Sequence, residues 1–140
     1  MNGAGETPAG SVAQVLLERS FDTESLHDLR QEIRRRLVSA GVAADATENF
    51  VFAINEGLIN AIMHGGGGGD LTLLKTDDRV VATVEDHRPT APFELPTHLP
   101  PATSMGGRGL WLVYRSCDEV RLEAGERGLR LILELRVPVG

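Results

Sequence analysis

The stretch from residue 50 to residue 69 constrains this chain most, because it is long, apolar and closed by five consecutive glycines. It contains no Lys, Arg or Asp, which is typical of a largely buried helix. With about 100° of rotation per residue, one side of such a helix forms a continuous apolar stripe suited to a core. That stripe consists of Phe50, Val51, Ile54, Leu58, Ala61 and Ile62.

The other side of the same predicted helix carries polar side chains among apolar neighbours. Glu56 and Asn60 lie about 40° apart on a helical projection, and His64 lies about another 40° further round. The apolar neighbours on this side are Phe52, Ile59 and Met63. A carboxylate is rarely placed in an apolar helix without a partner. This face is therefore more typical of a functional site than of an ordinary surface.

The composition is that of a soluble globular protein. With 140 residues, 41% hydrophobic and 24% charged, the chain is long enough for one domain with a real core. We expect this domain at residues 12–140, after a disordered tail at residues 1–11. The net charge of −6 argues against a nucleic-acid-binding protein, because no basic surplus exists to neutralise phosphates.

The cysteine count and the hydropathy pattern bear on location. The single cysteine, Cys117, excludes an internal disulfide framework and fits a reducing compartment. No apolar run approaches the roughly 20 residues of a membrane span, and the N-terminus lacks the pattern of a signal peptide. We therefore expect a cytoplasmic protein that does not associate with membranes.

The first half of the chain is predicted to contain a strand and two helices. The strand is expected at residues 12–21, and residues 22–25 supply caps for a first helix that stops at Gly41. The apolar positions of this helix recur at helical spacing, at Leu26, Leu29, Ile33 and Leu37.

The second helix is predicted to begin near residue 45 and to end at the glycine run. Either Asp45 or Thr47 is expected to cap its start. Residues 65–69 are predicted to be a flexible hinge or loop, because glycine does not sustain a helix.

Four further strands are predicted, as two hairpins. Residues 70–75 and 79–85 surround a Thr-Asp-Asp turn, and residues 119–123 and 129–137 surround a turn at residues 125–128. The last strand alternates leucines with mostly polar residues, as a strand with one buried face does.

A proline-rich connection at residues 87–107 separates the hairpins, followed by a short helix near residues 110–114. Connections of this length are often lids or binding loops. The order of elements predicts an α+β two-layer sandwich, with a mixed, mostly antiparallel sheet and helices on one face.

The first helix carries a cluster of arginines on its polar side, with Glu32 among them. One interpretation is an ordinary solvated helix face. The other is a basic docking patch for an acidic partner. The arginines are Arg30, Arg34, Arg35 and Arg36.

Three features carry candidate chemistry, and each has a plain alternative. Glu56 could be a general base beside a metal-binding amide of Asn60, or a buried carboxylate that bonds nearby backbone. Asp86 ends an apolar strand and could accept a hydrogen bond from a base amine, or cap a turn. The glycine cluster at residues 106–109 could present N–H groups to phosphate, or form an ordinary turn.

Together, and in this order, these motifs resemble the GHKL (histidine-kinase-like) ATPase superfamily. The residues that carry the resemblance are Glu56, Asn60, Ala61, His64, Gly65, Asp86, Gly107, Arg108, Gly109 and Leu110. The bacterial anti-sigma-factor serine/threonine kinases are similar in chain length and in the motif Asn-Glu-Gly-Leu-Ile-Asn-Ala-Ile-Met-His-Gly. The resemblance covers residues 12–137 and implies the Bergerat ATPase fold.

The resemblance also implies a role for each motif in binding ATP and Mg²⁺. Glu56 would activate the attacking hydroxyl, Asn60 would bind Mg²⁺, and Asp86 would accept the adenine amino group. Nucleotide contacts would come from His64 and, after a mobile lid, from Gly106, Gly107, Arg108, Gly109 and Leu110. A positioned nucleophile and a cation on the phosphates are what phosphoryl transfer needs.

Two positions depart from the family pattern, both near the expected adenine end. Arg88 stands where the family usually has glycine, and Leu129 stands where a threonine hydroxyl often helps. His64 also has a plain alternative, as a histidine that closes the helix near its negative end. The remaining histidines are scattered and Cys117 stands alone, so no zinc site is predicted.

Three functions compete. The first, implied by the resemblance, is a protein serine/threonine kinase that phosphorylates an anti-anti-sigma partner and sequesters a sigma factor, with a homodimer possible. The second is an ATP-binding module that switches partners without phosphotransfer. The third is a structural domain without nucleotide, which leaves Glu56 and Asn60 in an apolar helix unexplained.

Overall fold

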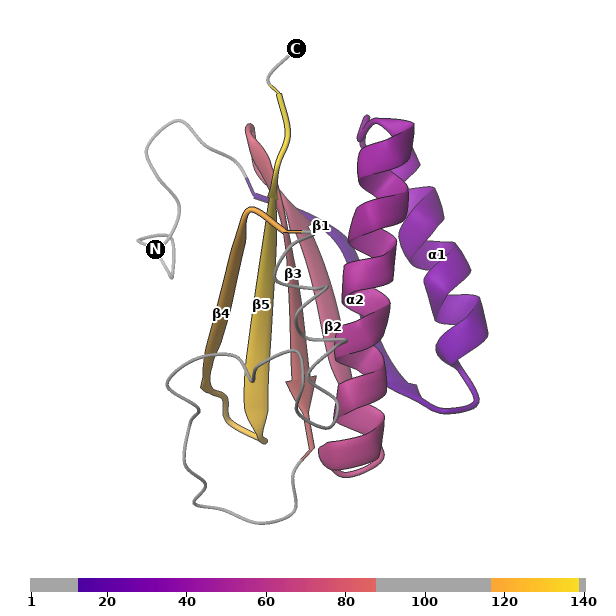
Figure 1. Cartoon of the computed structure of the whole chain (residues 1–140), viewed down its shortest axis with the longest axis vertical. Coiled ribbons are helices and arrows are strands. Elements are labelled where there is room, and N and C mark those ends of the chain that lie inside the picture. The colour runs from indigo at the N-terminus through magenta and orange to yellow at the C-terminus, as the bar shows by residue number, and fades with distance from the viewer. Residues whose placement is uncertain (1–12, 88–116, 139–140) are drawn as a thin grey trace, which may run out of the picture.

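The computed structural model describes residues 13–87 and 117–138, and its helices lie on one face of a single sheet (Figure 1). This arrangement confirms the predicted α+β two-layer sandwich. The elements are β1 (Gln14–Asp22), α1 (Leu26–Ser39), α2 (Ala44–His64), β2 (Gly68–Lys75), β3 (Arg79–Asp86), β4 (Glu119–Ala124) and β5 (Leu129–Arg136).

The sheet has five strands in the order β1-β2-β3-β5-β4, and every neighbouring pair is antiparallel. Both predicted hairpins are confirmed, as β2–β3 and β4–β5. The prediction of a mixed sheet is wrong for the strands that the structure describes, because none of their pairings is parallel. Since β5 inserts between β3 and β4, the turn that joins β4 to β5 lies near the end of β3 (Figure 1).

The core lies between the sheet and the two helices. Alternate residues of the strands point toward the helices, as period-two patterning requires. The largest fully buried side chains are Ile33, Leu37, Thr47, Phe50, Ile54, Leu58, Leu71, Leu73, Val80 and Leu133. The spacing of apolar residues predicted for α1 is confirmed, because Leu29, Ile33 and Leu37 are all buried.

The predicted apolar stripe of α2 is confirmed except at Ile62, which is only partly buried. Ala53 and Gly57 are buried as well, because α2 lies very close to the sheet. A Cβ added at Gly57 would lie 2.9 Å from the Cδ2 of Leu131 on β5. The stripe is therefore wider than predicted, and its small residues let the helix approach the strands.

The prediction of a largely buried helix is confirmed for residues 50–63, except at Phe52, which is 43% exposed, and Met63, which is 70% exposed. The prediction of a side-chain cap at the start of α2 is wrong. No side chain caps its start at Ala43. Thr47 is buried instead, and its hydroxyl donates to the carbonyl of Val42, while the carboxylate of Asp45 accepts the neighbouring N–H of residue 46.

The glycine run is shorter as a connection than predicted. Gly68 and Gly69 belong to β2 and pair with Asp22 and Phe21 of β1. Only residues 65–67 connect α2 to β2, so the predicted flexible loop of five residues is wrong. The helix can turn into the strand this abruptly because residues 66 and 67 have φ of +91° and +90°, which glycine adopts without strain.

The arginines of α1 mostly bond within the helical layer. Arg34 donates to both carboxylate oxygens of Glu48 on α2, at 2.8 and 3.0 Å, and Arg30 donates to the Oδ1 of Asn55 at 3.2 Å. The other two arginines pair with a glutamate of α1 itself. These bonds account for the cluster as a polar helix face that also ties α1 to α2. Neither described helix is long and apolar enough to cross a membrane.

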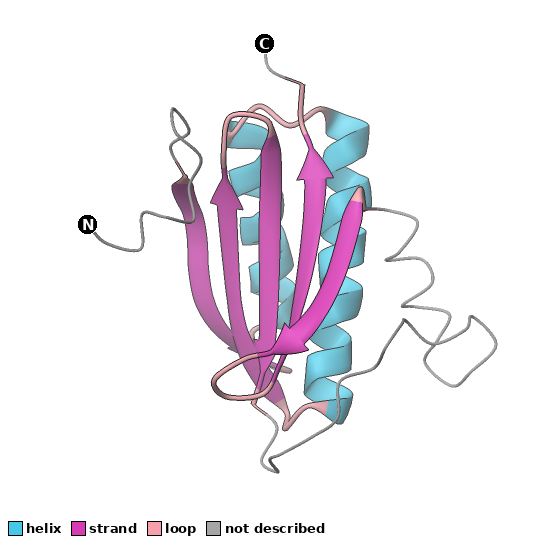
Figure 2. Cartoon of the chain, turned by 90° about the vertical axis from the view of Figure 1, so that its left-hand side faces the viewer, coloured by secondary structure: helices cyan, strands magenta, loops and turns pink. Residues whose placement is uncertain are grey.

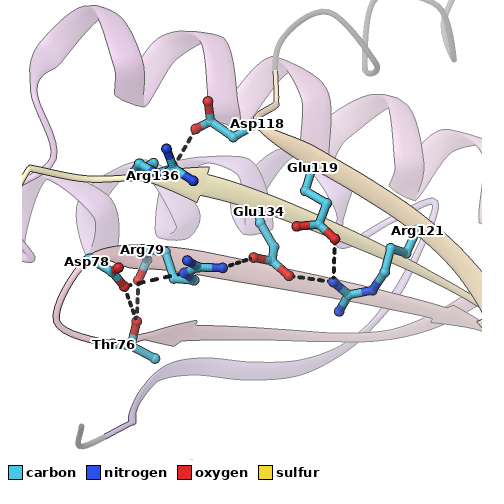
Figure 3. Close-up of polar contacts among 8 residues, drawn as sticks. All are labelled: Thr76, Asp78, Arg79, Asp118, Glu119, Arg121, Glu134 and Arg136. Atoms are coloured by element: carbon cyan, nitrogen blue, oxygen red, sulfur yellow. Dashed lines mark hydrogen bonds and ion pairs between the residues drawn. The ribbon is translucent and has the colours of Figure 1, made fainter. Parts of the chain in front are cut away.

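The opposite face of the sheet is not covered by any described element, and Figure 2 views it directly. It carries ion pairs that cross the strands. At one end, Glu134 of β5 lies between Arg79 of β3 and Arg121 of β4, at 2.7 Å from each (Figure 3). Glu134 is only 7% exposed, although the alternation of β5 predicted an open polar face at that position. Two flanking guanidinium groups cover it and compensate its desolvation.

Candidate functional site

The polar face of α2 is where the sequence predicts it, in the second half of the helix. Glu56 and Asn60 lie one helical turn apart and are both half-buried, whereas His64 in the last turn is exposed. The side-chain amide nitrogen of Asn60 is buried and has no hydrogen-bond partner among the residues that the structure describes. A buried amide in this state is costly unless a ligand satisfies it.

Asp86 is the last residue of β3 and lies on the helix side of the sheet. Its side chain is buried, with 4% of the residue exposed. Its Oδ1 accepts a hydrogen bond of 2.9 Å from the backbone N–H of Leu129, the first residue of β5. The main chain of the neighbouring strand therefore holds the carboxylate in a defined orientation.

Asp86 packs directly against the C-terminal end of α2. A Cβ added at Gly65 would lie 2.4 Å from the Oδ2 of Asp86 and 2.5 Å from its Cβ and Cγ. The backbone N–H of His87 also donates to the carbonyl of Gly65, at 3.0 Å. The structure thus joins the helix that carries Glu56 and Asn60 to the strand that ends in Asp86, at the lower end of the molecule in Figure 1.

A second carboxylate, Asp70 of β2, gathers contacts from three other segments on the uncovered face. It accepts from the hydroxyl of Ser20 on β1 at 2.6 Å, and it contacts the Nε2 of His87 at 2.8 Å. Arg127, from the turn between β4 and β5, lies 3.2 Å away. Burial raises the pKa of Asp70, but the hydrogen bonds from His87 and Ser20 and the nearby positive charges outweigh it and hold the pKa below its ordinary 3.8.

Sequence reasoning missed the residues that place Asp86. The glycine run was predicted as a loop that begins at residue 65. Nothing in the sequence pattern indicated that the side chain of an aspartate 21 positions later packs where a Cβ of residue 65 would lie. The contribution of Leu129 is a main-chain N–H, which no residue-type pattern reveals. The contacts of Asp70 depend on the register between strands, whereas the sequence predicted only which strands form hairpins.

The residues present are compatible with the magnesium site that the resemblance implies. Mg²⁺ usually takes one or two protein oxygens, with phosphate oxygens and water completing its shell. Asn60 offers one side-chain amide whose buried nitrogen has no hydrogen-bond partner among the described residues, and a rotation of the amide would present its oxygen. No cluster of three or more His, Cys, Asp or Glu side chains suited to a metal ion occurs in the described ranges.

The remaining predicted site residues lie outside the described residues. These are Gly106, Gly107, Arg108, Gly109 and Leu110, together with Arg88, Trp111, the proline-rich connection and the short helix after it. The structure therefore brings Glu56, Asn60 and Asp86 to connected elements. The phosphate-side glycines remain an expectation.

Residues 20–135 match the family model of the histidine kinase-like ATPase domain. No curated protein matches the chain. A crystal structure of the RsbU and RsbW domains of Rv1364c from Mycobacterium tuberculosis is similar, with a TM-score of 0.64 and 23% sequence identity.

That alignment covers 86% of this chain but only 32% of the Mycobacterium tuberculosis chain, so the likeness concerns the fold of one part of a longer protein. The family model, in contrast, spans β2, β3, β4, β5 and both helices, which are the elements that carry Glu56, Asn60 and Asp86. The chain belongs to the histidine kinase-like ATPase domain family.

Proposed function

We propose that this chain is an ATP- and Mg²⁺-dependent serine/threonine protein kinase that acts as an anti-sigma regulatory factor. It would phosphorylate a small anti-anti-sigma protein and, when not so engaged, sequester a sigma factor. The observation that carries the proposal is the half-buried pair Glu56 and Asn60, one turn apart on a helix whose end packs against Asp86. Membership of an ATPase family implies ATP binding, and the similar solved structure includes an RsbW domain.

Asp86 would recognise the base. A carboxylate is an acceptor at both oxygens, so it suits the exocyclic amine of adenine. Leu129 and Gly65 hold this carboxylate from two sides, which limits its motion before a ligand arrives. Preorganised acceptors of this kind give specificity, because a base without the amine would bring no donor to the acceptor that the carboxylate offers.

Glu56 would act as the general base on the hydroxyl of the substrate protein. Glu56 is half-buried in the second half of α2, and a carboxylate at this position could accept the proton of a hydroxyl. Its position on a packed helix, rather than on a loop, fixes the direction from which it reaches a nucleophile.

Asn60 would hold the cation one turn further along α2. When bound, Mg²⁺ would spread the charge of the phosphates during transfer. His64 would lie at the nucleotide end of the same helix, and the phosphates would be lined by residues 106–110, as the resemblance implies. A cytoplasmic location, a domain at residues 12–140 and a homodimer belong to the same proposal.

The substitution Glu56→Ala tests the catalytic assignment. We expect transfer of the γ-phosphate to a partner protein to be abolished, while the affinity for Mg-ATP measured by calorimetry changes by less than about twofold. Glu48→Ala is the matched control, because Glu48 lies at the other end of α2 and pairs with Arg34. Equal phosphorylation by the Glu56 variant and the wild type would remove Glu56 from the mechanism.

An ATP-binding module that switches partners without phosphotransfer is the second candidate. The departure at Leu129 favours it, because that side chain has no hydroxyl to offer at the adenine end. Titration of the wild-type chain with Mg-ATP, followed by a transfer assay, separates the two. Binding without transfer would establish the module, and no binding would exclude both.

A further inference from the structure

Two consecutive carboxylates of β3 hold the same turn from opposite faces of the sheet. On the helix side, Asp86 accepts the N–H of Leu129 at 2.9 Å. On the uncovered side, the Oε2 of Glu85 accepts the N–H of Arg127 at 2.8 Å. The two donors are only two residues apart, at the junction of the β4–β5 turn with β5.

The Glu85 carboxylate fills the concave side of that turn. The turn closes with a hydrogen bond of 2.8 Å from the N–H of Gly125 to the carbonyl of Gly128. A Cβ added at Gly125 would lie 2.6 Å from both the Cδ and the Oε2 of Glu85. Glycine at position 125 therefore lets the backbone close around the carboxylate.

The other oxygen of Glu85 is also fixed. Arg130 of β5 donates to Oε1 through Nη2 at 3.2 Å and through Nε at 3.3 Å, and the Glu85 side chain is only 16% exposed. Hydrogen bonds to a charged acceptor are stronger than those between neutral groups. Glu85 thus connects the turn to both β3 and β5 with little freedom to shift.

These contacts also fix the position of the Leu129 main chain. Its N–H points at Asp86 only while the turn before it keeps its shape, and Glu85 bonds the main chain of that turn at the N–H of Arg127, whereas Asp70 contacts only the Arg127 side chain. We infer that Glu85 is a positioning residue for Asp86, and that discrimination between nucleotide bases depends on it. This inference rests on the proposed nucleotide site, and it extends that site to the uncovered face of the sheet.

The variant Glu85→Gln tests this role, because it keeps the size of the side chain and removes its charge. We expect the affinity for Mg-ATP to fall about threefold to tenfold. The affinity for inosine triphosphate, whose base has an oxo group in place of the amine, should change less than about twofold. A general loss of structure would weaken both nucleotides equally, and that outcome would overturn the inference.

Two further variants complete the comparison. Glu123→Gln removes another carboxylate, which bonds Arg130 at 3.1 Å but not the N–H of Arg127 that Glu85 holds, so the ATP-to-inosine triphosphate preference should stay as in the wild type. In an Asp86→Asn background, Glu85→Gln should no longer change that preference. An additional change of the same size in this background would show that Glu85 acts independently of Asp86.

Hydrogen exchange of the Leu129 amide supplies a measurement without nucleotide. We expect exchange to accelerate in Glu85→Gln and in Gly125→Ala, whose added methyl displaces the Glu85 carboxylate from the other side, and not in Glu123→Gln. Unchanged exchange in both Glu85→Gln and Gly125→Ala would refute the coupling between Glu85 and the N–H of Leu129. If the wild type binds neither nucleotide, the proposed function fails, while the exchange rates still decide whether Glu85 holds Leu129.

Discussion

Gly65→Ala is the sharpest perturbation that the structure offers for the candidate nucleotide site. The added Cβ would lie 2.4 Å from the Oδ2 of Asp86 and 2.5 Å from its Cβ and Cγ. Carbon atoms in contact are normally about 3.5 to 4.0 Å apart, so Asp86 must move by about 1 Å. The backbone at Gly65 has φ of −125°, which alanine adopts, so the effect comes from this contact and not from backbone strain.

The size of the effect follows from what such a shift breaks. A movement of about 1 Å takes the 2.9 Å bond between Leu129 and Asp86 beyond hydrogen-bonding distance. Loss of a bond to a buried charged group costs about 1.5 to 3 kcal/mol, and overpacking costs about 1 to 3 kcal/mol. Partial relaxation offsets some of this, so we expect the free energy of unfolding to fall by about 2 to 4 kcal/mol.

Nucleotide affinity should fall together with stability. If a displaced Asp86 no longer accepts the adenine amine, the lost bond of about 1.5 to 3 kcal/mol raises the Kd for Mg-ATP by about tenfold to a hundredfold. Calorimetric titration measures the affinity, at a temperature where circular dichroism shows the variant fully folded. Urea denaturation measures the stability.

Gly67→Ala is the matched control. Gly67 has φ of +90° and nothing within 4 Å of an added Cβ, so alanine there brings backbone strain of about 1 to 2 kcal/mol and no contact with Asp86. It should lower stability and leave ATP affinity unchanged within about twofold. Wild-type affinity in Gly65→Ala, or an equal loss in Gly67→Ala, would refute the reasoning.

Three other predictions concern single side chains. Glu134→Gln should lower the free energy of unfolding by about 1 to 2 kcal/mol in urea denaturation, because two arginines lose a nearly buried anion; an unchanged midpoint would contradict this. The pKa of Asp70 is depressed in the folded chain, so its contribution is present above its unfolded value of 3.8 and is lost as the pH falls through the folded pKa; the stability advantage of the wild type over Asp70→Asn should therefore shrink in acid below that value. Burial, with a smaller effect from a neighbouring aspartate, raises the pKa of the Cys117 thiol to about 12, so iodoacetamide at pH 8 should label it only when the protein is unfolded.

The fold followed from the sequence because its main signals are local and periodic. The apolar spacing of Leu29, Ile33 and Leu37 leaves α1 one side to bury, and the alternation along β3 and β5 leaves each strand one buried face. Turn residues between alternating segments marked both hairpins. Strand order depends on contacts between segments far apart in the sequence, and so does the absence of parallel pairing among the described strands. Neither could be predicted from local patterns.

The errors in α2 and in the glycine run have a common physical cause. Capping residues were predicted from their preference for helix starts, but Thr47 faces the core and bonds a preceding carbonyl because packing outweighs that preference. Gly68 and Gly69 were assigned to a loop on propensity, although pairing with β1 makes them part of a strand. In each case a tertiary contact decided the local conformation.

The residues of the candidate site also fall into two groups, those that could be predicted from the sequence and those that could not. Glu56, Asn60 and Asp86 were predicted because their chemistry is unusual at their positions. Gly65 and Glu85 were not, because they act through close approach and through hydrogen bonds to main chain. Residues that supply chemistry can be recognised in a sequence, whereas residues that position them are recognised only in the folded structure.

Position 129 departs from the family pattern in residue type but contributes to the candidate site through its main chain. By residue type, Leu129 lacks the threonine hydroxyl that the resemblance leads one to expect, and a neutral hydrogen bond of that kind is worth about 1 kcal/mol. The structure shows that Leu129 keeps a main-chain N–H bond to the Asp86 carboxylate, which any residue except proline can form. A bond to a charged group is worth about 1.5 to 3 kcal/mol, so the retained interaction outweighs the missing one. The substitution is therefore expected to weaken adenine recognition by less than about tenfold and not to eliminate it.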